Sequence, residues 1–453
     1  MFAHFLKTYQ LQQDDKFLLP KKQLVTYALY ALIGVGLLCL FIDPAPASRR
    51  PAVAAPLVLE QLPPPPSSYQ GDEVVATSRT APPQQGETPT SASAAAPPPC
   101  DYSDGEWVPD PSPPLYNGTT CEAIKEGRSC TGNGQTDTGY VHWRWQPRRC
   151  ELPAFSPDAF LRWLRNRHMA FVGDSLARNQ AESLVCLLSS RSPAELVARH
   201  RNGDDARFRR WAFPEHNATV SIFWSPFLVR GVEKSERDGV RHNELFLDAF
   251  DERWMSELGG IDALVLSAGH WFKIPSVYHD RGGVVGCHGC ANRTETSFLA
   301  VFRDAVRRTL AEVARRHEQQ HGGADAREKV VAMATFSPSH FEGDWDKGAP
   351  CPKKQPYKSA EKELGYTEAE LRKIVVEAVA DAGAASSSSL RFAALDVTTL
   401  ANLRPDGHPG PYMRKNPFAA AGNGRPVQND CLHWCMPGPV DTFNQILLQT
   451  VVP

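Results

Sequence analysis

The sequence predicts an α/β fold, a three-layer αβα sandwich in which helices cover both faces of a mainly parallel sheet. Short apolar runs with the length and composition of buried strands occur at residues 168–173, 220–224, 263–267, 330–336 and 391–397. Longer segments separate these runs, and some of them have helical periodicity. Strands that alternate with helices are typical of a parallel sheet covered on both faces.

Three helices are expected around this sheet. The first, residues 175–189, follows the first strand directly. The second is indicated by an apolar stripe at helical spacing, formed by Leu299, Phe302, Val306, Leu310 and Val313. The third is predicted to begin at a capping box, Thr367 with Glu370, and to continue through residues 371–380.

The N-terminal region predicts a membrane anchor. Residues 24–42 are uncharged and mostly apolar, and they are long enough to cross a bilayer as one helix. Four lysines precede them, which favours a cytosolic tail of residues 1–23 and a type II topology. A cleaved signal peptide is the alternative, but the apolar run is too long and begins too late for one.

The rest of the chain divides into three segments. Residues 43–99 are rich in Pro, Ala, Ser and Thr and predict a disordered stem. Residues 100–150, rich in Cys and Trp, predict a small disulfide-tied subdomain, and residues 151–453 predict the catalytic domain. A formal charge of −2 over 453 residues excludes a broad basic field, so we expect no nucleic-acid partner and favour a neutral substrate such as a glycan.

The cysteines and glycosylation motifs indicate a secretory compartment. One of eleven cysteines, Cys39, lies in the predicted anchor, and the even number that follows favours disulfides. Cys287 and Cys290 could form a redox pair or part of a zinc site, but no second metal-binding pair accompanies them, so we expect a local disulfide and no metal. Glycosylation motifs begin at Asn117, Asn217 and Asn292.

A candidate nucleophile follows the first predicted strand. Gly173, Asp174 and Ser175 lie where that strand ends and a helix begins, so Ser175 is expected at the carboxyl edge of the sheet. Glycine permits the tight turn, and the free N–H groups of the helix can stabilise an oxyanion. The alternative is that Asp174 or Ser175 only caps the helix.

A candidate base lies near the C-terminus. Asp430 and His433 are three residues apart, close enough on a turn for the carboxylate to fix the imidazole tautomer that activates a serine. Cys431 and Cys435 flank this histidine, and two disulfides there would hold the base in place. A structural loop with an incidental histidine is the alternative.

Together these motifs resemble the GDSL/SGNH esterase superfamily and, more closely, the plant trichome birefringence-like family. The resemblance covers residues 100–452 and includes CDYSDGEWVPD, DTGYVHWRWQPRRC, GDSLARNQ and DCLHWCMPGPVD. Members of that family are Golgi O-acetyltransferases of wall polysaccharides. The resemblance implies an SGNH-like fold, with Ser175 as nucleophile, Asp430 as orienting acid and His433 as base.

The resemblance also implies further details. Residues 267–290 and 335–351 are similar to the xyloglucan-acetylating branch, whose relatives acetylate mannans. The implied disulfides are Cys100 with Cys150, Cys121 with Cys186, Cys130 with Cys435, and Cys351 with Cys431.

The implied reaction is a double displacement through an acetylated Ser175. It requires an acetyl donor, acetyl-CoA or another carrier, and no bound cofactor; the acceptor would be a hemicellulose at a Golgi membrane. A polysaccharide acetylesterase and a non-catalytic wall-glycan-binding protein remain alternatives.

Oxyanion and substrate contacts are less defined by the sequence. The Ser175 amide is the first candidate for an oxyanion donor. The other candidates for oxyanion or substrate contacts are Gly173, Asp174, Arg178, Asn179, Gly269 and His270. SGNH relatives place an asparagine in the block where this chain has Gly269 and His270.

Aromatic and acidic residues offer two further candidate sugar contacts. Trp143 and Trp145 either line a glycan groove or pack the cysteine-rich segment. A stretch that begins at His340 either binds sugar or is a solvated loop, and it contains Glu342, Asp344, Trp345 and Asp346.

Overall fold

The computed structural model describes residues 100–199, 207–235, 239–321, 328–344, 347–419 and 427–452. The predicted tail, anchor and stem lie outside these ranges. Within them, none of the helices combines the length and the apolar character needed to cross a membrane.

A seven-stranded sheet forms the centre of the fold, in the order β13-β12-β9-β3-β6-β5-β4. The strands are β3 (His168–Gly173), β4 (Glu195–Arg199), β5 (Phe208–Phe213), β6 (Ala218–Trp224), β9 (Ala263–Ser267), β12 (Lys329–Ala334) and β13 (Leu390–Leu395). All pairs from β13 to β6 are parallel, whereas β5 and β4 add an antiparallel edge. The predicted parallel sheet is therefore present, with an edge that the sequence pattern did not indicate.

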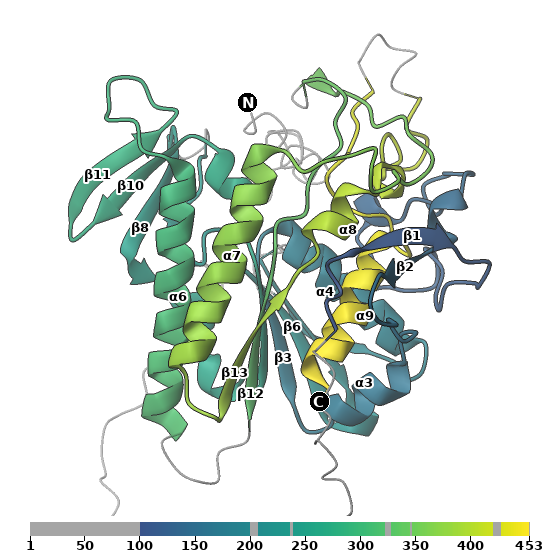
Figure 1. The fold of residues 1–453 in the computed structure, drawn as a ribbon, viewed down its shortest axis with the longest axis horizontal. Helices are drawn as coiled ribbons and strands as arrows, with labels where there is room; N and C mark the ends of the chain where they lie inside the picture. The colour runs from purple at the N-terminus through teal and green to yellow at the C-terminus, as the bar shows by residue number, and fades with distance from the viewer. Residues whose placement is uncertain are drawn as a thin grey trace, which may run out of the picture. The chain divides into compact units, whose positions relative to one another are not determined.

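Helices cover both faces of this sheet (Figure 1). One face carries α3 (Pro157–Leu164), α4 (Ser175–Ser189) and α9 (Pro439–Val451), and the other carries α6 (Phe298–His321) and α7 (Tyr366–Ala385). Along β3, Met169 and Phe171 enter the first core, while Ala170 and Val172 enter the second. This alternation confirms the predicted three-layer α/β arrangement.

The predicted capping box at Thr367 is wrong. Helix α7 already begins at Tyr366, with the extended Gly365 at its N-cap and no side-chain cap bond. Thr367 therefore lies inside the first turn, where its backbone is helical and its side chain does not occupy the capping position.

A second, four-stranded sheet was not predicted. Its order is β11-β10-β8-β7, formed by β7 (Val229–Val232), β8 (Asn243–Phe250), β10 (Ser276–Asp280) and β11 (Gly283–His288). Several of its residues are exposed, including Val284 and Val285. Strands that are only partly buried lack the continuous apolar run by which the central strands were recognised.

The cysteine-rich segment is built on a two-stranded antiparallel sheet, β1 (Gly105–Pro109) and β2 (Trp143–Pro147). The rings of Trp107 and Trp145 meet edge to face at 5.6 Å, and both side chains are buried. Trp107 Nε1 donates to the carbonyl of Leu400 in the short helix α8 (Thr398–Asn402). Trp145 therefore packs this segment, as one of the two alternatives expected.

The described residues contain five disulfides. The structure joins Cys100 to Cys150, Cys121 to Cys186, Cys130 to Cys435, Cys287 to Cys290, and Cys351 to Cys431. These are the pairs implied by the family resemblance, together with the local Cys287–Cys290 bridge. Two of them connect residues 100–150 with the remainder of the fold.

The core between α4 and the sheet predicts a matched pair of stability effects. Leu184 in α4 is fully buried, so Leu184→Ala should lower the free energy of unfolding by about 2–5 kcal/mol through lost burial and a cavity. Leu196 in β4 is 48% exposed, and Leu196→Ala should change it by about 0.5 kcal/mol or less. Denaturant unfolding checks both, and equal losses would contradict the assigned core.

Candidate active site

A sharp turn between β3 and α4 presents Ser175. Gly173 ends the strand with φ of +153°, and a Cβ on it would lie 1.8 Å from the carbonyl oxygen of Ser267 on β9. The same carbonyl accepts a hydrogen bond from the Asp174 amide at 3.2 Å. Close approach of two strand ends therefore requires glycine at position 173.

The residue before the serine caps the helix. Asp174 has extended backbone, and its Oδ1 accepts a hydrogen bond from the Leu176 amide at 2.9 Å. Burial raises the pKa of Asp174 to about 6. Ser175 is the first helical residue and is half-buried in a run of fully buried neighbours. The capping role thus belongs to Asp174, which leaves the Ser175 hydroxyl accessible at the helix N-terminus.

Asp430 and His433 lie in a tight turn that is held by hydrogen bonds of the Asp430 carboxylate. Asp430 Oδ1 accepts hydrogen bonds from the amides of Leu432 at 3.0 Å and His433 at 2.9 Å. Its Oδ2 lies 2.7 Å from His433 Nδ1. Since a carboxylate only accepts, Nδ1 carries the proton, and Nε2 is left with a lone pair.

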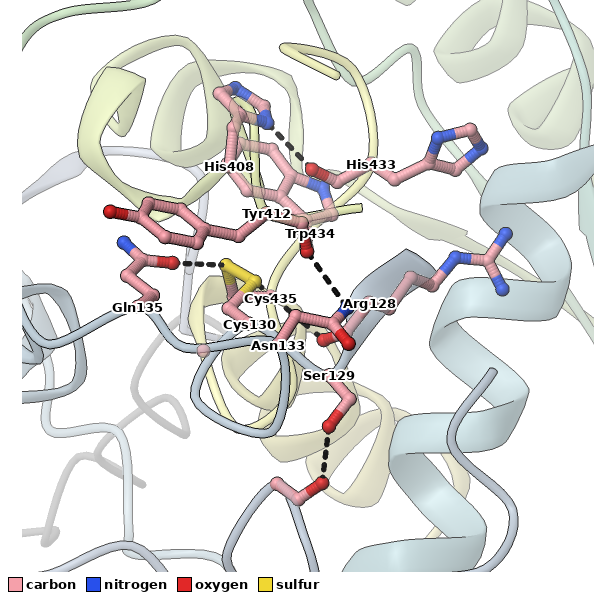
Figure 2. The surroundings of a disulfide bond; sticks show 12 residues. Arg128, Ser129, Cys130, Asn133, Gln135, His408, Tyr412, His433, Trp434 and Cys435 are labelled. Carbon is pink, nitrogen blue, oxygen red and sulfur yellow. Dashed lines mark hydrogen bonds between the residues drawn. A yellow bond between two sulfur atoms is a disulfide. The ribbon is translucent and has the colours of Figure 1, made fainter. Parts of the chain in front are cut away.

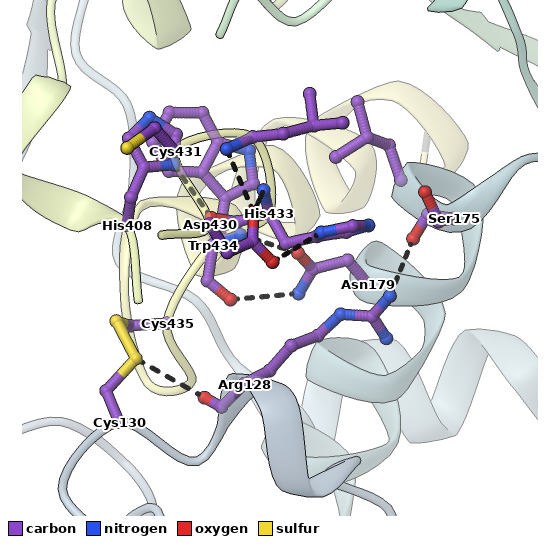
Figure 3. Close-up of polar contacts among 12 residues, drawn as sticks. Arg128, Cys130, Ser175, Asn179, His408, Asp430, Cys431, His433, Trp434 and Cys435 are labelled. Carbon is purple, nitrogen blue, oxygen red and sulfur yellow. Dashed lines mark hydrogen bonds and ion pairs between the residues drawn. A yellow bond between two sulfur atoms is a disulfide. The ribbon is translucent and has the colours of Figure 1, made fainter. Parts of the chain in front are cut away.

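The free nitrogen of this imidazole faces the serine. Figure 3 shows the His433 ring pointing from Asp430 toward Ser175. Among the described residues, Nε2 is buried and has no hydrogen-bond partner. A neutral imidazole with an unoccupied lone pair beside a hydroxyl is the arrangement required of a general base.

Burial and charge set the protonation of this pair. Burial by itself raises the pKa of Asp430, but the charge and hydrogen bonds of His433 outweigh it, so this pKa is well below its usual range. Burial lowers the pKa of His433, against the attraction of Asp430. The pair therefore stays as carboxylate and neutral imidazole near neutral pH.

Asn179 attaches this turn to the helix that carries the nucleophile. It lies one helical turn after Ser175 and is fully buried. Its Oδ1 accepts a hydrogen bond from the Trp434 amide at 2.7 Å, and its Nδ2 donates to the Trp434 carbonyl at 3.3 Å. Asn179 was a candidate oxyanion or substrate contact, but the structure uses its amide to position the histidine loop.

Arg128 reaches the site from the cysteine-rich segment. Its guanidinium donates to the carbonyl of Ser175 at 3.1 Å and to Glu182 of α4 at 2.6 Å, and both charged side chains are buried. Its own carbonyl accepts a hydrogen bond from the Met436 amide at 3.0 Å. Arg128 therefore contacts the turn that holds Ser175 as well as the loop that holds His433.

Two disulfides fix the loop at separate points. Cys435, two residues after His433, is bonded to Cys130, and the bond lies next to Arg128 (Figure 2). Cys431, directly after Asp430, is bonded to Cys351. Together these bonds hold the loop at both sides of the imidazole, which limits its freedom to move relative to Ser175.

Arg128 was not among the residues predicted for the site. Its partners Ser175 and Glu182 lie 47 and 54 residues away, and no local pattern links them. The one available signal was the acidic Glu182 shortly before the apolar run Leu184–Leu188 of the same helix, since a carboxylate in a buried helix needs a cation.

The remaining oxyanion candidates have varied surroundings. The guanidinium of Arg178 is buried, 5.0 Å from the centroid of the Trp224 ring. Gly269 has φ of +148°, and a Cβ there would lie 2.8 Å from Phe336. Burial lowers the pKa of His270 to about 3, and its Nε2 donates to the Ser337 carbonyl at 2.9 Å.

The neutral His270 ring therefore has no proton left for an oxyanion. With Nε2 donating to a carbonyl, Nδ1 carries the lone pair and can only accept. The Ser175 backbone N–H stays the first predicted oxyanion donor, followed by Arg178 and the stretch from Gly269 to His270.

The second group of predicted sugar contacts is only partly described. His340 is buried and bonded to His408, so its ring is not a surface contact for sugar. Glu342 and Asp344 are exposed, and Asp344 pairs with Lys347 at 2.6 Å. Trp345 and Asp346 lie outside the described residues.

The three candidate glycosylation sites all lie at the surface. Asn117, Asn217 and Asn292 are exposed. Their modification stays a prediction.

The fold and site define a class of protein. A serine at a strand-to-helix turn on the carboxyl edge of a parallel sheet, faced by an Asp–His pair, is the arrangement of α/β enzymes that transfer or hydrolyse acyl groups. The chain belongs to the GDSL/SGNH-like acyl-esterase family found in Pmr5 and Cas1p, whose sequence pattern matches residues 152–450. The PMR5 N-terminal domain pattern matches residues 98–151.

Similar proteins come from plants. The chain is 53% identical to xyloglucan O-acetyltransferase 2 of Populus trichocarpa over 356 residues, 78% of this chain and 82% of the relative. It is 49% identical to xyloglucan O-acetyltransferase 1 of Arabidopsis thaliana over 355 residues, 77% and 80% of the two chains. Identity to protein trichome birefringence-like 26 of Arabidopsis thaliana is 37% over 354 residues, 78% and 77%. The predicted trichome birefringence-like family and its xyloglucan-related branch are confirmed.

The turn at Gly173 predicts a large effect of a single methyl group. Gly173→Ala would place a Cβ against the Ser267 carbonyl, so we expect a strong loss of folded yield or a displaced Ser175. Gly260→Ala is the matched control because a Cβ at Gly260 meets nothing within 4 Å. Secretion yield and thermal unfolding compare the two, and a well-folded, fully active Gly173→Ala variant would contradict the described turn.

The buried ion pair of Arg128 with Glu182 predicts a larger loss of stability than an exposed pair. Arg128→Met would leave the buried Glu182 with Arg209 as its remaining ion-pair partner in the described residues, and we expect about 3–5 kcal/mol lower stability. Arg148→Met, which removes a half-exposed pair with Asp104, should cost about 1 kcal/mol or less. Unfolding experiments on both variants measure the difference, and similar losses would contradict the stabilising role given to the buried Arg128–Glu182 pair.

Proposed function

We propose that this chain is a hemicellulose O-acetyltransferase that moves acetyl groups onto hydroxyls of xyloglucan, most simply its galactosyl side chains, through an acetylated Ser175. The observation that carries the proposal is the lone pair of His433 Nε2, which has no partner among the described residues and faces Ser175. The substrate class follows from relatives at 49–53% identity that carry the name xyloglucan O-acetyltransferase.

In the first half-reaction the serine accepts the acetyl group. His433 Nε2 takes the proton from Ser175 Oγ as that oxygen attacks the acetyl carbonyl carbon. The resulting oxyanion forms at the N-terminus of α4, where the helix dipole and free N–H groups stabilise negative charge. The donor then leaves with the proton held by His433, and Asp430 stabilises the imidazolium between these two steps.

In the second half-reaction the sugar replaces the donor. A glycan hydroxyl loses its proton to His433 Nε2 and attacks the acetylated Ser175, and the serine oxygen leaves as it regains that proton. Water in place of the sugar would give acetate, so transfer depends on an acceptor held closer than water. We propose acetyl-CoA or a similar carrier as donor. We also propose a Golgi membrane location through residues 24–42, because their sequence predicts a membrane span.

Transfer to a defined oligosaccharide tests this proposal. The purified full chain, incubated with acetyl-CoA and a xyloglucan oligosaccharide, should raise the oligosaccharide mass by one acetyl group per transfer. Ser175→Ala should lower the rate by roughly 10³-fold or more because the nucleophile is lost. Ser388→Ala, at an exposed position, is the control and should keep the wild-type rate.

Other outcomes would redirect the proposal. Release of acetate from an acetylated polymer, without transfer, would favour an esterase. A mass gain on mannan and none on xyloglucan would change the acceptor. An unchanged rate in Ser175→Ala would contradict the mechanism.

A further inference from the structure

Two buried histidines lie directly behind the catalytic loop. His340 Nδ1 and His408 Nε2 are 2.7 Å apart. The second nitrogen of each ring faces a backbone carbonyl: His340 Nε2 lies 2.9 Å from the oxygen of Asn402, and His408 Nδ1 lies 2.7 Å from the oxygen of His433. Figure 2 shows the bond from His408 to the His433 backbone. The rings therefore form a continuous connection from the catalytic histidine to the end of α8.

This connection requires more protons than two neutral rings hold. A carbonyl oxygen only accepts, so each contact at the two ends needs an N–H on the ring. The contact between His340 and His408 needs a third N–H. Two neutral imidazoles carry two N–H groups in total, so one contact in a neutral pair would join two acceptors. At 2.7 Å two facing lone pairs repel.

Opposing influences act on the extra proton. Burial lowers the pKa of His340 to about 4 and places the pKa of His408 well below its ordinary value. The charged and titratable groups that face the two rings are Lys362, Arg404, Asp406, Asp430 and His433. The acids favour a proton, whereas the cations oppose it.

Two contacts reduce the cost of placing the extra proton on the buried rings. Arg404 is paired with Asp406 through two hydrogen bonds of 2.8 and 3.0 Å, so their charges largely cancel. His408 stacks on Trp434, with ring centroids 4.3 Å apart and planes at 19°, and an indole face attracts a cation. The hydrogen bonds and this stacking favour the protonated pair, and burial favours its loss.

We propose that His340 and His408 share one extra proton and act as pH-sensitive positioning residues for His433. The proposal rests on the proposed role of His433 as base. With the shared proton, all three hydrogen bonds form, and the bond from His408 to the His433 carbonyl holds the backbone of the catalytic histidine. Without it, one contact is lost and the pair separates, so the loop beside Ser175 loosens.

The sign of the pH effect follows from this arrangement. His433 must be neutral to act as base, so activity rises as pH increases through its lowered pKa. For kcat/KM to fall again on the alkaline side, the shared proton must leave at a higher pH than the proton of His433, which requires the three hydrogen bonds to outweigh the burial of the two rings. Because burial lowers the pKa of all three rings, we expect an optimum shifted to acidic pH.

His340→Asn is the discriminating variant. The Asn amide can donate from the position of Nδ1 to His408 Nε2 without an extra proton, so His408 can keep its bond to the His433 carbonyl in a neutral state. We expect the fall of kcat/KM on the alkaline side to disappear in this variant. His408→Phe keeps an aromatic ring beside Trp434 but has no hydrogen bond, and it should lower kcat several-fold with KM little changed.

A direct proton count needs no variant. In the full chain labelled with ¹⁵N-histidine, NMR should show three protonated nitrogens in the His340–His408 pair at acidic pH and two after the transition, at the pH where kcat/KM falls. Two neutral rings at every pH at which the chain is folded would overturn the proposal, as would an unchanged alkaline fall in His340→Asn. Retained activity of Ser175→Ala would instead refute the proposed function and leave this proton count intact.

Discussion

The site depends on two hydrogen bonds between the Asn179 side chain and the backbone of Trp434. They join helix α4, which begins with Ser175, to the residue that follows His433. Nucleophile and base come from positions more than 250 residues apart, so no local geometry sets their separation. A side-chain amide that accepts from the N–H and donates to the C=O of one residue fixes the backbone of that residue in orientation as well as in distance. Asp430 then sets the ring by bonding both the backbone and Nδ1 of His433.

The cysteine-rich segment is part of this arrangement. Arg128 contacts the Ser175 carbonyl, and the neighbouring Cys130 is bonded to Cys435 across a sequence separation of 305 residues. Tyr116 adds a hydrogen bond of 2.8 Å to Asp441 at the start of α9. The segment therefore supplies buried polar partners and covalent constraints to the loops on which catalysis is proposed to depend. This explains physically why the two family patterns, residues 98–151 and 152–450, occur in one chain.

What the sequence could predict was mostly local. The turn from Gly173 to Ser175 was recognisable because an apolar strand, a glycine and a helix follow one another directly, and Asp430 and His433 lie within one turn. The role of Asn179 and the Arg128–Glu182 pair depends on tertiary contacts, which residue type alone does not encode. The four-stranded sheet was missed because its strands are partly exposed. The polar residues that follow His340 in the sequence suggested that it contacts sugar at the surface. In the structure its ring is buried against His408.

Detection of the acetylated intermediate tests the central claim most directly. The wild-type chain would be mixed with acetyl donor, quenched within one turnover and digested, and the peptide that contains Ser175 would be analysed by mass spectrometry. An acetyl group on Ser175 that disappears when a xyloglucan oligosaccharide is added is the predicted result. Transfer to the oligosaccharide without acetylation of Ser175, or with the acetyl group on another residue, would contradict it.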